Sequence, residues 1–291
     1  MRTIPANTLI PPKAPNLPVG PVEYSQLYID QLNNVLRIYF NELDNAFQLL
    51  SGSSQGGAYL RFPYGAFHQD GTTTLSANIT NVSTTAISVA STSGFPSSGY
   101  FLIDSEIIQY TSTTSTTFAG TITRGVFGTT NVAHTAGAAI TEVQGVASPT
   151  TIGSILFNAT DYSNGVSIDS TDKSKVVFAT AGLYNIMVSA QLLNFTTTDD
   201  NVTFWFRLNG TDIANTASIE AVPSKHGSSP GAIILAYNII QEVAANDYIQ
   251  LKWTSDSGNS VTATYPAGTS PVHPVSPAII LTAQFVSAPP A

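Results

Sequence analysis

The sequence predicts a mostly β protein with a single helix near its N-terminus. Beyond Gly57, apolar and polar residues alternate with a period of two between turn signals, which is typical of half-buried strands. Residues 22–50 instead repeat their apolar positions every three or four residues, which indicates a helix. Hydrophobic residues make up 43% of the 291 and charged residues 10%, so the composition suits a packed core rather than a disordered chain.

The composition also narrows the function. Ten basic against eighteen acidic residues give a net charge of −8, which argues against a nucleic-acid-binding surface. The absence of cysteine excludes disulfides, thiolate zinc sites and cysteine nucleophiles. No apolar run reaches the ~18 residues of a membrane span, and residues 1–20 lack a run of signal-peptide length. We therefore expect no membrane insertion. Any extracellular role would have to arise without the usual export signal, as it does for proteins of a virion that is released by lysis.

Residues 1–21 are predicted to form an extended arm. Six prolines prevent a helix, and the arm carries two bases and no acid. A basic extended segment on an acidic chain is either a disordered terminus or a docking strap. In the second case the candidate anchoring residues are Arg2, Pro11, Pro12 and Lys13.

Residues 22–50 are predicted to form a helical stalk resembling a coiled coil. Seven residues fall at alternating steps of three and four: Ile29, Leu32, Leu36, Tyr39, Leu43, Ala46 and Leu50. Further apolar residues widen the stripe, which favours a bundle of three or more helices and makes these seven the candidate trimer interface. The alternative is an amphipathic helix lying on its own domain. A Gly- and Ser-rich joint then follows, and residues 51–75 are assigned to this linker and a first strand.

Residues 146–291 are predicted to form a β-sandwich or jelly roll. Strands are expected within 186–192, 202–208, 249–253 and 278–286. Asn209-Gly210 directly follows the second of these and is a strong hairpin signal.

Residues 176–285 carry several motifs in a fixed order. The motifs are Phe178-Ala179-Thr180-Ala181-Gly182-Leu183-Tyr184, Phe206-Arg207-Leu208-Asn209-Gly210, Ala245-Asn246-Asp247-Tyr248-Ile249-Gln250-Leu251 and Pro274-Val275-Ser276-Pro277-Ala278-Ile279-Ile280-Leu281. This series resembles the jelly roll of the complement C1q and tumour-necrosis-factor superfamily, as found in phage structural proteins, although Asn246 stands where glycine is usual. The resemblance implies a ten-stranded jelly roll and a homotrimer.

Residues 76–145 are predicted to form a small all-β module, with short strands at 86–90, 100–103 and 106–111. The module contains several glycines and the series Leu102-Ile103-Asp104-Ser105-Glu106-Ile107-Ile108-Gln109-Tyr110, Thr123-Arg124-Gly125 and His134-Thr135-Ala136-Gly137. Together these resemble a module repeated in many phage virion proteins. Arg124 is the one base available to pair with Asp104 or Glu106, so these carboxylates are interpreted as structural.

The order of the segments suggests that this module is an insertion. Residues 60–67 resemble the opening strand that phage C1q-like domains place directly before the segment matching 155–158, yet about 75 residues intervene here. Insertion into a surface loop costs little closure entropy. The alternative is that the module simply precedes the jelly roll.

Catalytic motifs are weak. Residues 52–56 fit the G-x-S-x-G pattern but follow a helix inside a Gly/Ser linker, where a nucleophile elbow does not form. The four histidines have no zinc-ligand spacing. Asp169 with Asp172 and Asp199 with Asp200 leave calcium ligation open. We therefore expect no enzyme activity and no cofactor.

The sequence thus indicates a structural component of a bacteriophage virion. We expect a trimeric fibre, spike or decoration protein on the particle surface, anchored to capsid or tail proteins by its arm and projecting a β-rich head. The alternative is a host receptor-binding adhesin of the tail fibre that contacts a cell-surface glycan or protein. Tyr100 and Tyr265 are the candidate ligand contacts, and a structural role is the alternative for both.

Overall fold

The computed structural model describes residues 13–51, 62–146, 148–269 and 271–288. The chain divides into two compact units, residues 1–62 and residues 63–291, and each unit is described by itself.

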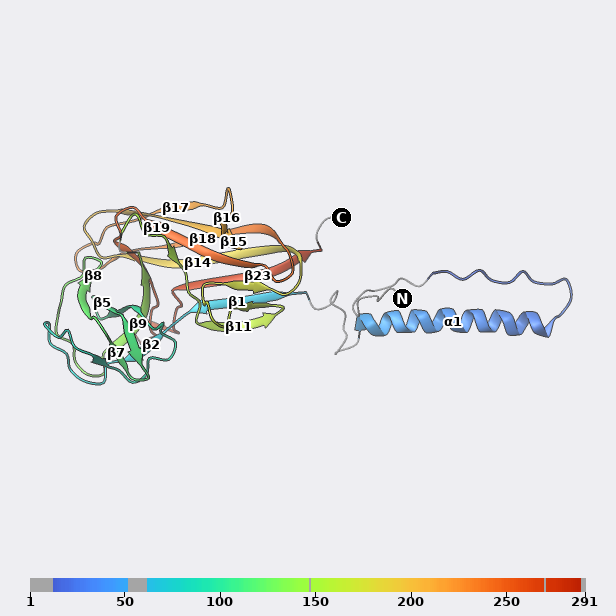
Figure 1. Cartoon of the computed structure of the whole chain (residues 1–291), viewed down its shortest axis with the longest axis horizontal. Helices are drawn as coiled ribbons and strands as arrows, with labels where there is room; N and C mark the ends of the chain where they lie inside the picture. Colours follow the sequence, from blue (N-terminus) through green and yellow to red (C-terminus); the bar gives the residue numbers. More distant parts are fainter. Residues whose placement is uncertain (1–12, 52–61, 147, 270, 289–291) are drawn as a thin grey trace. The chain divides into compact units, whose positions relative to one another are not determined.

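The first unit contains the helix α1 (Gln26–Ser51) and the segment before it. The helix begins four residues later than the sequence pattern predicts. Ser25 explains this start, because its Oγ accepts a hydrogen bond from the Tyr28 N–H at 3.3 Å and so caps the first turn. Residues 13–24 are not helical and run back alongside α1 (Figure 1).

The second unit is built on two facing sheets. Among the described residues, the first sheet has the strand order β11 (Ala159–Asn164), β1 (Tyr64–Gln69), β23 (Ile279–Ser287), β14 (Gly182–Asn194), with β18 (Gly231–Val243) also paired to β14. The second has the order β12 (Val166–Ile168), β13 (Val176–Phe178), β19 (Tyr248–Ser255), β15 (Asp200–Leu208), β16 (Thr211–Asp212), with β10 (Gly153–Ser154) on β19 and β17 (Ser218–Val222) on β15.

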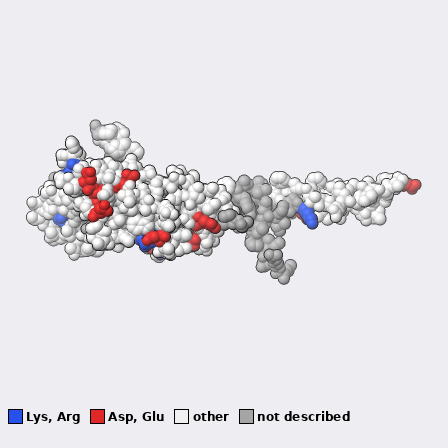
Figure 2. Space-filling view, turned by 90° about the horizontal axis from the view of Figure 1, so that it is seen from above, with Lys and Arg blue, Asp and Glu red and all other residues white. Residues whose placement is uncertain are grey.

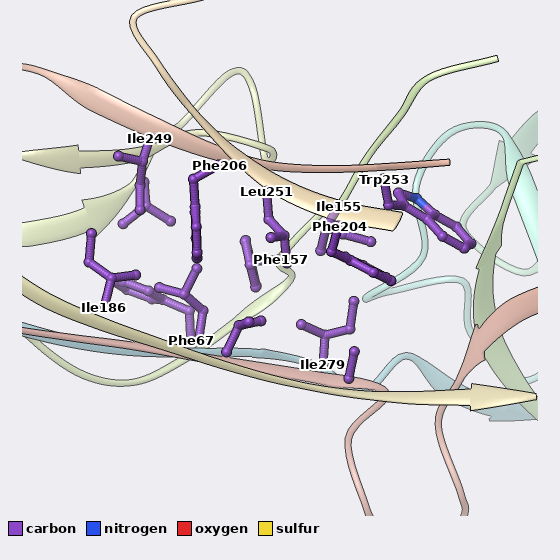
Figure 3. Packing of buried hydrophobic residues seen from close by; sticks show 14 of the residues in the cluster. Phe67, Ile155, Phe157, Ile186, Phe204, Phe206, Ile249, Leu251, Trp253 and Ile279 are labelled. Carbon is purple, nitrogen blue, oxygen red and sulfur yellow. The ribbon is translucent and has the colours of Figure 1, made fainter. Parts of the chain in front are cut away.

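The main hydrophobic core lies between these two sheets. Phe67, Ile186 and Ile279 point inward from the first sheet, and Phe206, Ile249, Leu251 and Trp253 point inward from the second (Figure 3). The predicted alternation along 202–208 is confirmed, since Val202, Phe204 and Phe206 are buried. Trp253 stacks on Phe204 with ring centroids 5.4 Å apart. The structure is therefore a sandwich closed around its own core.

The hairpin predicted at Asn209-Gly210 is also confirmed. Both residues have positive φ, 48° and 84°, and the turn joins β15 to the antiparallel β16. Two successive positive φ angles are typical of the tight hairpin turns that Asn-Gly favours.

The first sheet continues from the sandwich into a smaller lobe. Beyond β14 the order is β20 (Ser260–Ala263), β9 (Ala139–Gly145), β4 (Gly99–Ile103), β5 (Glu106–Tyr110) and β8 (Thr123–Val126), with β2 (Thr72–Thr74) on β9. A separate sheet in this lobe has the order β3 (Ile87–Ser88), β7 (Thr117–Ala119), β6 (Ser112–Thr114). The lobe has a core of its own, in which Phe101 and Phe118 stack at 4.6 Å.

A third apolar cluster joins this lobe to the sandwich. Ile107 and Phe127 come from the lobe, while Leu193, Phe195 and Val261 come from β14, β20 and the chain between them. Since β1 pairs with both β11 and β23, the segment that forms the lobe lies in sequence between two strands of the sandwich. A short hairpin of β21 (Gly268–Thr269) and β22 (Val272–His273) precedes the last strand.

Candidate functional site: two assembly surfaces

The helix α1 exposes several large apolar side chains along its length. Of the seven predicted interface residues, Ile29 is 37% exposed and Leu32, Leu36, Tyr39, Leu43 and Ala46 are half-buried. The side chain of Leu50 lies outside the described residues. The heptad spacing thus places the six described residues along one stripe of α1.

Large side chains beside this stripe are more exposed still. Phe40 is 62% and Phe47 is 59% exposed, and both lie on the same flank of the helix, seven residues apart. Fully burying a side chain of this size stabilises a protein by about 1.5–3 kcal/mol. Among the described residues, α1 therefore presents large apolar side chains that are more than half exposed.

The arm residues that the structure describes lie on the opposite flank. Lys13, Ala14 and Pro15 line a shallow pocket together with four residues of α1: Val35, Ile38, Tyr39 and Glu42. The other predicted anchoring residues, Arg2, Pro11 and Pro12, lie outside the described residues.

The second surface is the outer face of the first sandwich sheet, and β18 contributes most of it. Its outward residues are Ala232, Ile234, Ala236, Asn238, Ile240 and Glu242, and all six are partly or largely exposed. Ile234 is 67% and Ile240 is 64% exposed. An apolar outer face on a long strand is unusual for a surface in contact with water.

The neighbouring strands continue this face. Met187 on β14 is 50% exposed and stands opposite Asn238, while Asn185 stands opposite Ile240. The Asn238 Nδ2 donates to the Asn185 Oδ1 at 3.2 Å. On β23, Ile280 and Val286 are also exposed.

Charge is almost absent from this face. Of the outward residues of β14, β18 and β23, Glu242 is the one that carries a charge. Low charge is a property of much of the molecule: Figure 2 shows one side on which acids form small groups within a largely uncharged surface. Depletion of charge and enrichment of Ile and Met suit the buried centre of a protein–protein interface.

The carboxylates singled out in the small lobe form a buried charge network. The Arg124 Nε donates to the Glu106 Oε1 at 2.6 Å and its Nη2 to the Oε2 at 2.7 Å. The predicted pairing of Arg124 with Glu106 is confirmed, whereas Asp104 pairs with the Nδ1 of His134 at 2.7 Å. The Nε2 of His134 also contacts Glu106, at 2.9 Å. The sequence did not predict the contact of His134 with Glu106, because 28 residues separate the two.

The pKa of Glu106 reflects this network. Burial raises the pKa, but hydrogen bonds from Arg124, from the Val132 N–H and from His134 outweigh burial and hold it below its usual range. Arg124 also donates to the backbone carbonyls of Thr80 and Val132. The network thus joins strands β5 and β8 to the segments around Thr80 and Val132, which indicates a structural role.

Both candidate ligand tyrosines are half-buried at the joint between the lobe and the sandwich. Tyr100 packs edge-on against Phe127 with centroids 4.9 Å apart, and Tyr265 packs against the same cluster. Burial raises the pKa of both hydroxyls. This packing favours the structural alternative, and a ligand contact at either residue stays a prediction.

The acidic residues considered for calcium accept hydrogen bonds from other parts of the protein or from their own turn. The Asp169 Oδ1 accepts hydrogen bonds from the N–H groups of Asp172 and Thr171, which lower its pKa to about 2. Asp200 accepts from Ser255, Ser257 and Ser260. In the described part of the chain, no three His, Asp or Glu side chains are grouped so that they could hold a metal ion.

The helix that the structure describes is too polar to cross a membrane. No protein-family model matches the sequence, and no curated protein is significantly similar to it.

Proposed function

We propose that this chain is a structural protein of a bacteriophage virion, a homotrimeric fibre, spike or decoration protein on the particle surface. Its N-terminal arm would attach it to other virion proteins, and its β-rich unit would form the exposed head. The assignment to a phage rests on the motifs in residues 86–143 and 176–285.

The single observation that carries the assembly role is the exposed apolar stripe of α1. Phe40 is 62% exposed on this 26-residue helix, and packing between helices is the ordinary source of stability for such a stripe. The width of the stripe favours three helices over two.

The strand order of the head supports the finer proposal of a jelly roll. The order β11-β1-β23-β14-β18 faces the order β12-β13-β19-β15-β17, which makes five principal strands on each side of the main core among the described residues. Two facing sheets with non-sequential neighbours are typical of a jelly roll, and ten strands agree with the number that the resemblance implies. The outer face of β14, β18 and β23, where Glu242 carries the one charge, then offers each head a second contact with its neighbours in the proposed trimer.

Two measurements test the proposal. Light scattering of the full chain should give three times 30.6 kDa, and a mass near 30.6 kDa at micromolar concentration would contradict the trimer. A density map of the whole particle should then show the chain on its surface, on either capsid or tail.

Attachment is tested by removing residues 2–12, which precede the segment beside α1. The truncated chain should remain a trimer and fail to enter particles. Incorporation at the normal level would contradict the anchoring role of these residues. The variant Lys13→Ala measures separately how much Lys13 contributes to incorporation.

A further inference from the structure

The arm and the exposed phenylalanines lie on opposite flanks of the same helical stripe. The arm flank of α1 is formed by Tyr28, Val35 and Glu42, which are spaced seven residues apart. Phe40, which is 62% exposed, lies on the other flank of the stripe. The interface residues run between these two flanks.

The arm runs antiparallel to the helix along its own flank. Lys13 to Pro15 lie at the level of Val35 to Glu42, while Gly20 lies near the helix start, where a Cβ on Gly20 would stand 3.6 Å from the Tyr28 hydroxyl. The arm therefore reaches the first turns of α1 near Gly20. Ala14 lies beside the same turns of α1 that carry Phe40.

Charge follows the same division. The other charged residues of α1, namely Asp30, Arg37 and Asp44, repeat every seven residues on the side away from the stripe. Glu42 is the one charged residue of α1 on the arm flank, and Lys13 lines the same pocket. The arm thus places Lys13 beside Glu42. The outer side of the arm is apolar, with Leu17 and Val19 exposed.

In a parallel bundle, one flank of each helix faces the opposite flank of the next helix. We propose that residues 13–20 of each chain fill the groove between its own α1 and the α1 of the adjacent chain, where they cover the adjacent Phe40. The partner of the arm is thus a second copy of this chain, and the stalk is a three-helix bundle with an extended segment in each groove. This inference rests on the proposed trimer.

The absence of cysteine from the chain allows a direct test by cross-linking. One full-length chain carries Ala14→Cys and a second carries Phe40→Cys, and the two are co-expressed and oxidised. Because each chain has a single thiol, a disulfide between positions 14 and 40 can form only between chains. We expect a covalent dimer of the two chains on a non-reducing gel.

The matched control replaces Phe40→Cys by Asn41→Cys, on the polar side of the helix. This pair should give at least ten-fold less cross-linked dimer. A third variant, with Ala14→Cys and Ile38→Cys in one chain, reports the contact of the arm with its own helix and should form an internal disulfide.

The outcomes separate this inference from the trimer itself. A trimeric mass without the 14–40 cross-link, or with equal cross-linking at position 41, would overturn the placement of the arm and leave the trimer standing. A monomeric mass for the unmodified chain would overturn both.

Discussion

The helix and the head use the same kind of residue in opposite ways. In the head, apolar side chains alternate along strands and disappear into cores made by the head itself, so Phe204, Trp253 and Phe101 are almost completely buried. In α1 the apolar side chains repeat with helical spacing, and Phe40 and Phe47 remain exposed. The head therefore buries its large apolar side chains within itself, whereas α1 leaves several of its own exposed.

The outer face of β18 lies between these extremes. One side of the strand contributes Leu235 to the main core, while Ile234 and Ile240 on the other side are exposed. A single strand thus has one buried and one exposed apolar face. We expect substitutions on the buried face to change the stability of the head, and substitutions on the exposed face to change the oligomeric state.

The largest loss of stability is expected from the core. Trp253→Ala removes a fully buried ring that stacks on Phe204 and leaves a cavity between the sheets. Such truncations cost about 3–5 kcal/mol. Urea unfolding followed by the near-ultraviolet signal of the head should show this loss, at a protein concentration where the oligomeric state is unchanged. The exposed Val82→Ala is the control and should change stability by less than about 0.5 kcal/mol.

A comparable loss is expected from the charge network of the lobe. Arg124→Met leaves Glu106 buried without its main partner, and breaking a buried pair on one side costs about 3–5 kcal/mol. The double variant Arg124→Met with Glu106→Gln removes the uncompensated charge and should recover part of that loss. If both variants unfold at the same denaturant concentration, the network does not act as a charge pair.

Glu142 should make the head less stable as the pH rises. This side chain is buried, and the Asn158 Nδ2 donates to its Oε2 at 2.9 Å. Burial raises its pKa to about 8; the neighbouring Gln69 amide acts against burial, and the nearby charge of Asp70 adds to it. Between the ordinary value of 4.5 and about 8, the unfolded chain has released this proton and the folded chain still holds it. The free energy of unfolding should therefore fall by up to about 1.4 kcal/mol per pH unit in this window and level off above it.

Glu142→Gln tests this assignment. The amide keeps the shape of the side chain and cannot ionise, so the variant should lose this slope and be more stable than the parent at pH 8–9. Unfolding at pH 5, 7 and 9 measures the effect, and Asp161→Asn, at an exposed acid, is the control. An unchanged slope in Glu142→Gln would show that another group causes it.

The sequence predicted the elements whose pattern is local. The helix, the strands around 186–192 and 202–208 and the Asn-Gly hairpin each depend on residues within a short window, and they are confirmed apart from their ends. The longest strand it missed, β18, has apolar residues on both faces, so the run 231–240 has no alternation to read. Contacts between distant segments, such as the burial of Glu142 or the pairing of β1 with β11, leave no local signal at all.

A substitution in the helix should change the mass of the oligomer and leave the stability of the head unchanged. Leu36→Asp places a charge in the centre of the stripe, where an unpaired buried ion costs several kcal/mol. We expect the trimer to dissociate or lose its register while the unfolding of the head stays within about 0.5 kcal/mol of the parent. Asn41→Asp adds the same charge on the polar side of α1 and should leave the mass trimeric. A head destabilised by Leu36→Asp would contradict the division between the two units.

The smallest effect on stability, and the sharpest test of the comparison, is expected at β18. Ile240 is largely exposed, so Ile240→Lys should leave the unfolding of the head within about 0.5 kcal/mol of the parent. In the trimer, however, the added charges would meet an uncharged face of a neighbouring head, and three like charges would be desolvated together. We therefore expect sedimentation to show a trimer that dissociates at a protein concentration at least ten-fold higher than the parent. Glu220→Lys, at an exposed residue of β17 in the other sheet, is the control, and an equal shift in this variant would place the contact between heads somewhere other than the face of β14, β18 and β23.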